Sequence, residues 1–244
     1  MSQLLVQPLE WDSNFLGFPV GRLTAQQGSV ISLDTVAAQS RQAGMRLIYL
    51  VVDPDDAGTA NAARQVGAWL ADQKVTFARA TTTQSEPSQP AAAGSGTVVN
   101  TNKFTPQLEQ LAWQSGEFSR FRLDARFAPH VFQELYTQWL RASLTGELAR
   151  VVLAYSSPEG AEVGLLTLGH QEGQASIGLL AVAGANRGQG IGQQLVEAAR
   201  QQAHRWGCPT LQVVTQRANE RACRFYARCG FELVREEHIY HLWL

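Results

Sequence analysis

The feature that most constrains the fold is a strand, a glycine-rich turn and a helix in direct succession between residues 176 and 200. The apolar run Ile177–Ala183 has the length of a buried strand. The sequence RGQGIG follows at 187–192, and then an apolar stripe with helical spacing, formed by Ile191, Leu195, Ala198, Ala199 and Ala203. Glycines at such a junction let successive backbone N–H groups converge, and the helix N-terminus adds partial positive charge. The sequence therefore predicts a site for phosphate or diphosphate.

Three kinds of phosphate site fit a glycine turn of this type. A Walker loop closes on Gly-Lys-Ser or Gly-Lys-Thr, which the turn lacks. A dinucleotide site expects an acidic residue about twenty positions on, and the next predicted strand, 210–216, contains no carboxylate. The third kind is an acyl-CoA loop, and Arg187-x-x-Gly190-x-Gly192 after an apolar strand resembles the signature of the GCN5-related N-acetyltransferases. We therefore interpret this turn as an acyl-CoA loop, in preference to a glycine-rich turn that binds no ligand.

This resemblance implies an α/β acetyltransferase (GNAT) fold over residues 97–244, with a mixed sheet and helices on both faces. It also implies that acetyl-CoA is the donor. No metal is expected, because the three cysteines of the chain fit no metal-ligand spacing. The glycine loop would bind the diphosphate, and the strand before it would bind the pantetheine arm. The residues implied are Leu180, Ala181, Val182, Arg187, Gly188, Gln189, Gly190, Ile191, Gly192 and Asn219.

A second stretch, Asn219 to Phe231, resembles the other signature of this family, in which a helix carries a catalytic tyrosine. Seven residues place Asn219 and Tyr226 on one face of a helix, about 10 Å apart along its axis. Proton transfer from tyrosine to a thiolate is uphill by about 2 kcal/mol, so we expect Tyr226 to stabilise the leaving sulfur by hydrogen bonding. The alternatives are that Tyr226 packs in the core and that Asn219 only caps the helix. Four residues could act as a general base, and none is assigned: Glu117, Asp124, His130 and His170.

Composition excludes several classes of function. The 244-residue chain has a net charge of −1, which argues against broad contact with nucleic acid or an acidic membrane. The N-terminus lacks a basic start and a long apolar core, and no apolar run reaches the length of a membrane span. The three cysteines, Cys208, Cys223 and Cys229, form no CxxC pair. Reduced thiols and a cytoplasmic location are expected.

A shift in composition predicts two domains. Residues 1–80 are expected to form a small α/β domain, residues 81–96 a Pro/Ala/Ser-rich linker, and residues 97–244 the acetyltransferase domain. We expect a loop over 9–18, a helix over 59–70, a strand over 74–78 and several closing strands over 231–244. The stretch 115–130 has the periodicity of neither helix nor strand. The order strand–helix–strand over 46–80 repeats that over 210–237, and Asn61-x-x-Arg64 echoes Asn219-x-Arg221; partial duplication and chance both explain this.

Further pieces resemble the dTDP-fucosamine acetyltransferases within the family: LEWDSNFLGFPVGRL at the start, SRFRLDARF at 119–127, YTQWL and IGLLAV. The resemblance implies a nucleotide-linked amino sugar as acceptor, dTDP-4-amino-4,6-dideoxy-D-galactose, in polysaccharide biosynthesis, and a homodimer. Arginines 120, 122 and 126 could pair with the acceptor's diphosphate, or they could face solvent while neighbouring aromatics anchor the loop. Peptide N-acetylation and acyl-CoA binding without catalysis remain alternatives. The acceptor residues expected are Arg120, Arg122, Phe121, Trp11 and Asn14.

Overall fold

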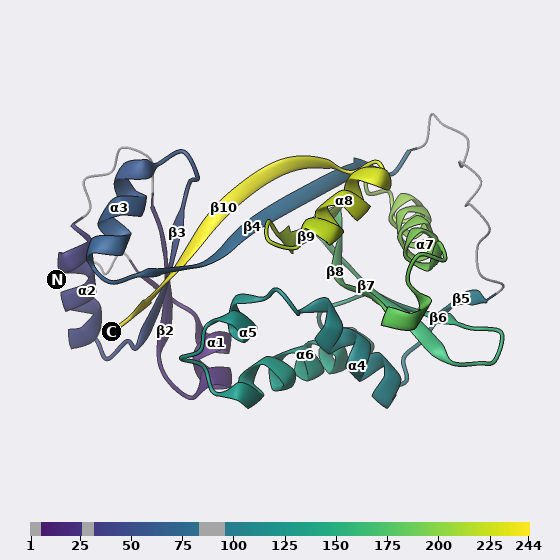
Figure 1. Ribbon diagram of the computed structural model, residues 1–244, viewed down its shortest axis with the longest axis horizontal. Helices are drawn as coiled ribbons and strands as arrows, with labels where there is room; N and C mark the ends of the chain where they lie inside the picture. Colours follow the sequence, from purple (N-terminus) through teal and green to yellow (C-terminus); the bar gives the residue numbers. More distant parts are fainter. Residues whose placement is uncertain (1–5, 26–31, 83–95) are drawn as a thin grey trace. The chain divides into compact units, whose positions relative to one another are not determined.

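The computed structural model describes residues 6–25, 32–82 and 96–244 (Figure 1). The chain divides into two compact units, the first made of residues up to 75 with 216–218 and 235–244, and the second of 76–215 and 219–234. Two long strands, β4 (Trp69–Ala80) and β10 (Glu232–Trp243), supply residues to both. The segment 235–244, which the sequence assigns to the second domain, thus belongs to the first unit. Most of the expected linker, 83–95, lies outside the described residues, and none of the described helices could cross a membrane.

The first unit is built around two parallel strands and the helix between them. The strand order is β1-β2-β3-β10-β4, with β2 parallel to β3 and antiparallel pairing of β1 with β2 and of β10 with β3. One face of these strands forms a core with α2 and α3, which includes Ile48, Leu50, Val52, Tyr240 and Leu242. Besides β4 and β10, the elements are β1 (Gln7–Pro8), α1 (Glu10–Leu16), β2 (Val20–Thr24), α2 (Leu33–Gln42), β3 (Leu47–Val52) and α3 (Ala57–Gln65).

Helix α1 occupies the stretch for which the sequence predicted a loop. None of its residues is buried, and its seven residues make only about two turns, too few for a helical periodicity to be detected. Acidic Glu10 and Asp12 lie in its first turn, where they favour the helix dipole, and Gly17 ends it at φ 74°. The Ser13 hydroxyl donates to the Leu9 carbonyl at 2.7 Å and accepts the Val20 N–H at 2.9 Å. Polar contacts, rather than burial, connect the helix to β2.

The second unit has the strand order β4-β9-β8-β7-β6-β5, in which β8 and β9 are parallel. Helices α4 and α6 pack side by side (Figure 1). A core of fully buried leucines includes Leu165, Leu166, Leu179 and Leu195. Its elements are β5 (Thr97–Asn100), α4 (Pro106–Ser115), α5 (Arg120–Leu123), α6 (Pro129–Leu144), β6 (Val151–Ser156), β7 (Glu162–Gln171), β8 (Gln174–Val182), the 3-10 turn η1 (Gly184–Asn186), α7 (Ile191–Arg205), β9 (Thr210–Gln216) and α8 (Glu220–Arg228).

Three further local predictions differ from the structure. Helix α3 ends at Gln65, because Gly67 adopts φ 83° and turns the chain, so that Trp69 and Leu70 open β4 instead of closing the helix. The C-terminal region forms one twelve-residue strand, β10, and not several. The stretch 115–130 contains the short helix α5, whose N-cap Ser119 accepts the Phe121 N–H at 3.2 Å.

The two units repeat one motif. In the first, β2-α2-β3-α3-β4 has the same order and the same parallel pair as β8-α7-β9-α8-β10. Helices α3 and α8 both have nine residues, and the capping side chains Asp56 and Asn219 each accept the N–H three residues on. A glycine with positive φ follows eleven residues after each cap (56 to 67, 219 to 230). This alignment puts Ala63 at the position of Tyr226. The residue equivalent to Asn219 is therefore Asp56, and not Asn61, which lies inside α3.

Candidate active site

A cavity of about 600 Å³ lies within the second unit. It is bounded by the end of β8, the glycine loop with the first turn of α7, the exposed face of α8, and the end of α4. All the expected cofactor residues except Gln189 line it, and so does Tyr226. Gln189 is exposed to solvent. The sequence therefore identified three of the four walls, and the end of α4 is the one it did not.

The sheet opens beside this cavity. Strands β8 and β9 pair from Ala175 with Leu211 to Ile177 with Val213, and their pairing ends there, although β8 continues to Val182. On its other side β8 stays paired with β7, through an irregularity at which Thr167 Oγ1 accepts the Leu179 N–H at 2.8 Å. Beyond Ile177 one edge of β8 is therefore available for an extended ligand.

The glycines of the loop meet different physical requirements. Gly188 and Gly190 have φ of 82° and 77°, a left-handed conformation that side chains disfavour, and Gly190 is the N-cap of α7. A Cβ on Gly192 would lie 3.0 Å from the Phe225 ring, so glycine there permits close packing of α7 against α8. The Arg187 Nε donates to the Val182 carbonyl at 2.9 Å, which fixes the loop to the end of β8. The positive φ of two glycines and one side-chain hydrogen bond thus define the conformation of the loop.

Tyr226 lines the cavity and is also part of the core. Its ring lies 6.0 Å from Phe77, 5.3 Å from Phe225 and 5.7 Å from Phe231. Burial raises the pKa of the Tyr226 phenol well above its usual value, and the neighbouring Cys229 and Cys223 thiols raise it further. The hydroxyl therefore stays protonated at neutral pH and can serve as a hydrogen-bond donor. The packing role and the expected catalytic role are compatible in one side chain.

The cavity carries a positive surplus. Arg187, Arg221 and Arg228 line it together with one carboxylate, Glu117, the only acidic group among the described residues of the lining. An excess of cations in a concave site attracts phosphates. Arg221 and Arg228 are seven residues apart, like Asn219 and Tyr226, so the helical repeat could have revealed them in the sequence.

Glu117 reaches the cavity because it directly follows α4 and its capping Gly116. No local pattern in the sequence signals this, since α4 and the glycine loop are more than sixty residues apart in the chain. The other three base candidates do not line the cavity. One of them, Asp124, is buried and accepts a hydrogen bond from the Arg126 Nε at 2.9 Å.

None of the five expected acceptor residues lines this cavity. On α5, Arg120 stacks over Phe121 at 4.7 Å and Arg122 over Phe132 at 5.1 Å. In the first unit, Trp11 and Asn14 are exposed on α1, and Trp11 stacks on Phe15 at 5.3 Å. Their acceptor roles remain predictions. Phe118, next to Glu117, does line the cavity.

Comparison with known proteins agrees with this geometry. The model of the acetyltransferase (GNAT) family matches residues 105–231. The dTDP-fucosamine acetyltransferase of Escherichia coli O6:H1 is 28% identical over 228 residues, 92% of each chain. The spore coat polysaccharide biosynthesis protein SpsD of Bacillus subtilis is 29% identical over 143 residues, 57% of this chain and 47% of that protein. A GCN5-related N-acetyltransferase from Sphaerobacter thermophilus shares the fold, with a TM-score of 0.63 at 16% identity over 98% of this chain and 76% of the other.

Proposed function

The chain belongs to the acetyltransferase (GNAT) family, and from this we propose that it acetylates the amine of a nucleotide-linked amino sugar, dTDP-4-amino-4,6-dideoxy-D-galactose. The observation that carries the proposal is one cavity in which a left-handed glycine loop, an open strand edge and a buried tyrosine meet. The acceptor class rests on the similarity to dTDP-fucosamine acetyltransferase, because that similarity covers 92% of both chains and therefore includes the first unit.

The lining residues fit acetyl-CoA. The N–H groups of the loop and the arginines at 187, 221 and 228 suit its phosphates, and the open edge of β8 suits its pantetheine arm. When bound, acetyl-CoA supplies the acetyl group as a thioester. Gly192 leaves room for that ligand beside Phe225, where any larger residue would crowd the helix packing.

Two side chains in the cavity, Glu117 and Tyr226, have different roles in the proposed reaction. Glu117 pairs with the ammonium of the acceptor and takes the proton that must leave before nitrogen attacks. Tyr226 donates a hydrogen bond to the sulfur as the carbon–sulfur bond breaks. Its raised pKa makes full proton transfer to sulfur less favourable than for an ordinary tyrosine, so the thiolate takes its proton from water.

The positions of the three cysteines favour direct attack of the acceptor amine on the thioester over a mechanism in which a cysteine is first acetylated. None of the three cysteines lines the cavity. Burial raises the pKa of Cys229 to about 11, which keeps its thiol protonated and poorly nucleophilic at neutral pH. Among the described residues there is also no cluster of three or more histidine, cysteine and acidic side chains that could hold a metal ion.

Glu117→Gln is expected to lower turnover about a hundredfold near neutral pH, a typical contribution of a general base. The defect should shrink as pH rises, because a growing fraction of the amine is then already deprotonated. The measurement is the pH profile of kcat for this variant beside Glu134→Gln, a control that removes an exposed carboxylate of α6 outside the cavity. A Glu117→Gln profile that overlays the control would remove Glu117 from the mechanism.

The proposed function is tested by thiol release from acetyl-CoA against a panel of acceptors. The panel contains dTDP-4-amino and dTDP-3-amino dideoxy sugars, a UDP-amino sugar and a peptide with a free N-terminus. We expect the highest kcat/KM with the dTDP-4-amino galactose derivative. If only the peptide is acetylated, the acceptor is a peptide amine and not a nucleotide-linked amino sugar. Binding of acetyl-CoA without turnover of any acceptor would favour a non-catalytic binding module.

One acetyl-CoA is expected to bind per chain, although the motif occurs twice. The first copy has Ala63 in place of Tyr226, and the sequence between β2 and α2, AQQGSVIS, lacks the Arg-x-x-Gly-x-Gly pattern. Titration calorimetry with a slowly hydrolysed acetyl-CoA analogue should give a stoichiometry near one. A value near two would mean that the first unit has kept a donor site.

A further inference from the structure

Two neighbouring glutamates on β10, Glu236 and Glu237, are surrounded by very different charges. Successive side chains of a strand point to opposite faces. Glu236 shares a face with Tyr240 and Leu242, which belong to the core of the first unit. Glu237 therefore projects from the other face.

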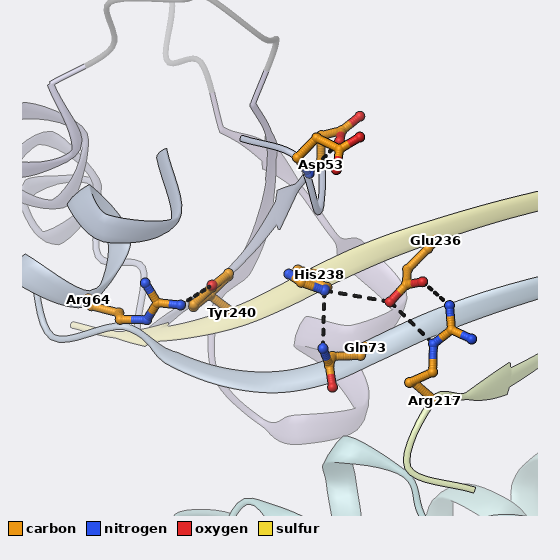
Figure 2. Close-up of polar contacts among 8 residues, drawn as sticks. Asp53, Arg64, Gln73, Arg217, Glu236, His238 and Tyr240 are labelled. Carbon is orange, nitrogen blue, oxygen red and sulfur yellow. Dashed lines mark hydrogen bonds and ion pairs between the residues drawn. The ribbon is translucent and has the colours of Figure 1, made fainter. Parts of the chain in front are cut away.

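The charges around Glu236 are balanced (Figure 2). Arg217 forms an ion pair with it, and the His238 Nε2 lies 3.7 Å from its carboxylate and 3.2 Å from the Gln73 amide nitrogen. Farther along the strand, Arg64 donates to the Tyr240 hydroxyl at 3.4 Å. One cation meets one carboxylate, as in an ordinary structural ion pair.

Glu237, in contrast, is contacted by three cations from three strands. The Arg235 Nη2 lies 2.8 Å from its carboxylate, the Lys74 Nζ 3.2 Å and the Arg22 Nη2 3.9 Å. The Glu237 side chain is only 8% exposed, whereas those of Arg22, Lys74 and Arg235 are 43%, 32% and 63% exposed. Among the described residues, Glu237 is the only carboxylate that forms an ion pair with these three cations, so three positive charges meet one negative charge in the cluster and solvent can reach them.

We propose that this cluster, Arg22, Lys74, Arg235 and Glu237, binds the diphosphate of a nucleotide such as dTDP. A nucleotide sugar carries two negative charges on its diphosphate, which equals the surplus of the cluster. Two arginines offer paired N–H donors that match phosphate oxygens, and Lys74 adds a point charge. Glu237 holds the three cations together in advance, which reduces the cost of ordering long side chains when the ligand binds.

The number of charges distinguishes a diphosphate from a nucleic acid. Proteins that bind a nucleic-acid backbone typically neutralise about six to ten phosphates, and three cations on a chain of net charge −1 fall well short. The inference rests on the proposed function for the identity of the acceptor, but the charges themselves do not depend on it.

The test combines kinetics with direct binding of dTDP to the full-length protein. Arg22→Met, Lys74→Met and Arg235→Met should each raise KM for the dTDP-amino sugar about tenfold and weaken dTDP binding in calorimetry by a similar factor. The KM for acetyl-CoA should not change. With the methyl glycoside of the same amino sugar, which lacks the diphosphate, the variants and the wild type should be equally slow. Lys74→Arg keeps the charge and should retain most of the dTDP affinity.

Arg41→Met is the matched control, because it removes an exposed arginine from the last turn of α2 in the same unit, outside the cluster. Cluster variants that bind dTDP as tightly as this control would overturn the inference, even if the wild type acetylates the nucleotide sugar. If the wild type acetylates no nucleotide sugar but binds dTDP in a way that depends on the cluster, the proposed function fails and the diphosphate site stands.

Discussion

Tyr226→Phe is expected to lower kcat by about one to three orders of magnitude, the range typical of a lost general acid or of one oxyanion donor. The hydroxyl is the only group removed, and the ring keeps its contacts with Phe77, Phe225 and Phe231. The dissociation constant of acetyl-CoA should therefore be unchanged. Pre-steady-state thiol release at saturating acetyl-CoA, together with calorimetry, measures the two quantities separately.

Tyr155→Phe is the control for the loss of a buried hydroxyl outside the cavity; it removes the acceptor of the Gly96 N–H and should keep full turnover. The raised pKa of Tyr226 adds a second readout. A phenol loses its donor proton only when the pH rises through its folded-state pKa, and burial moves that value upward. No loss of kcat from tyrosine ionisation is expected up to about pH 10. Unchanged turnover in Tyr226→Phe would leave the residue with a packing role alone.

Gly190→Val should raise the dissociation constant of acetyl-CoA at least about tenfold. Gly190 has φ 77°, and a residue with a Cβ loses about 1–2 kcal/mol in that conformation. The loop relieves this strain by changing its backbone conformation, which turns its N–H groups away from the diphosphate and weakens binding. Equilibrium dialysis or calorimetry with acetyl-CoA measures the effect.

Gly207→Val separates loss of binding from general strain. Gly207 also has φ 77°, follows α7 and lies outside the cavity. It should suffer a comparable loss of thermal stability and keep the wild-type affinity for acetyl-CoA. If the two variants bind acetyl-CoA equally well, the glycine loop is not the diphosphate site.

The sequence predicted best those parts in which a local pattern determines the structure. The strand, glycine turn and helix over 176–200 combine periodicity with residues of unusual backbone freedom, and the structure has β8, the turn and α7 there. Helix α4 begins with Pro106 directly after its cap Thr105, whose hydroxyl accepts the Leu108 N–H, and a proline in the first turn is a local signal of a helix start. Such signals require only a few neighbouring residues.

The features that the sequence did not reveal depend on contacts between distant segments. Helix α1 has no buried residue, and the full length of β4 is obscured because polar Asp72 and Thr76 are buried within it. The partner of β10 in the first unit, β3, lies almost 190 residues earlier in the chain. Glu117 enters the cavity, and Arg22 approaches Glu237, only after the strands and helices have packed.

Under the proposed function, with the nucleotide bound by the first unit, the repeated motif gives this enzyme room to change its acceptor. Because the first copy has Ala63 where the second has Tyr226, it lacks this part of the donor chemistry, and its surface is not bound by that requirement. The second copy, under the stricter demands of the thioester, can meanwhile stay the same. In such a chain a new specificity can evolve, or be engineered by exchanging strands of the first unit, without rebuilding the catalytic machinery.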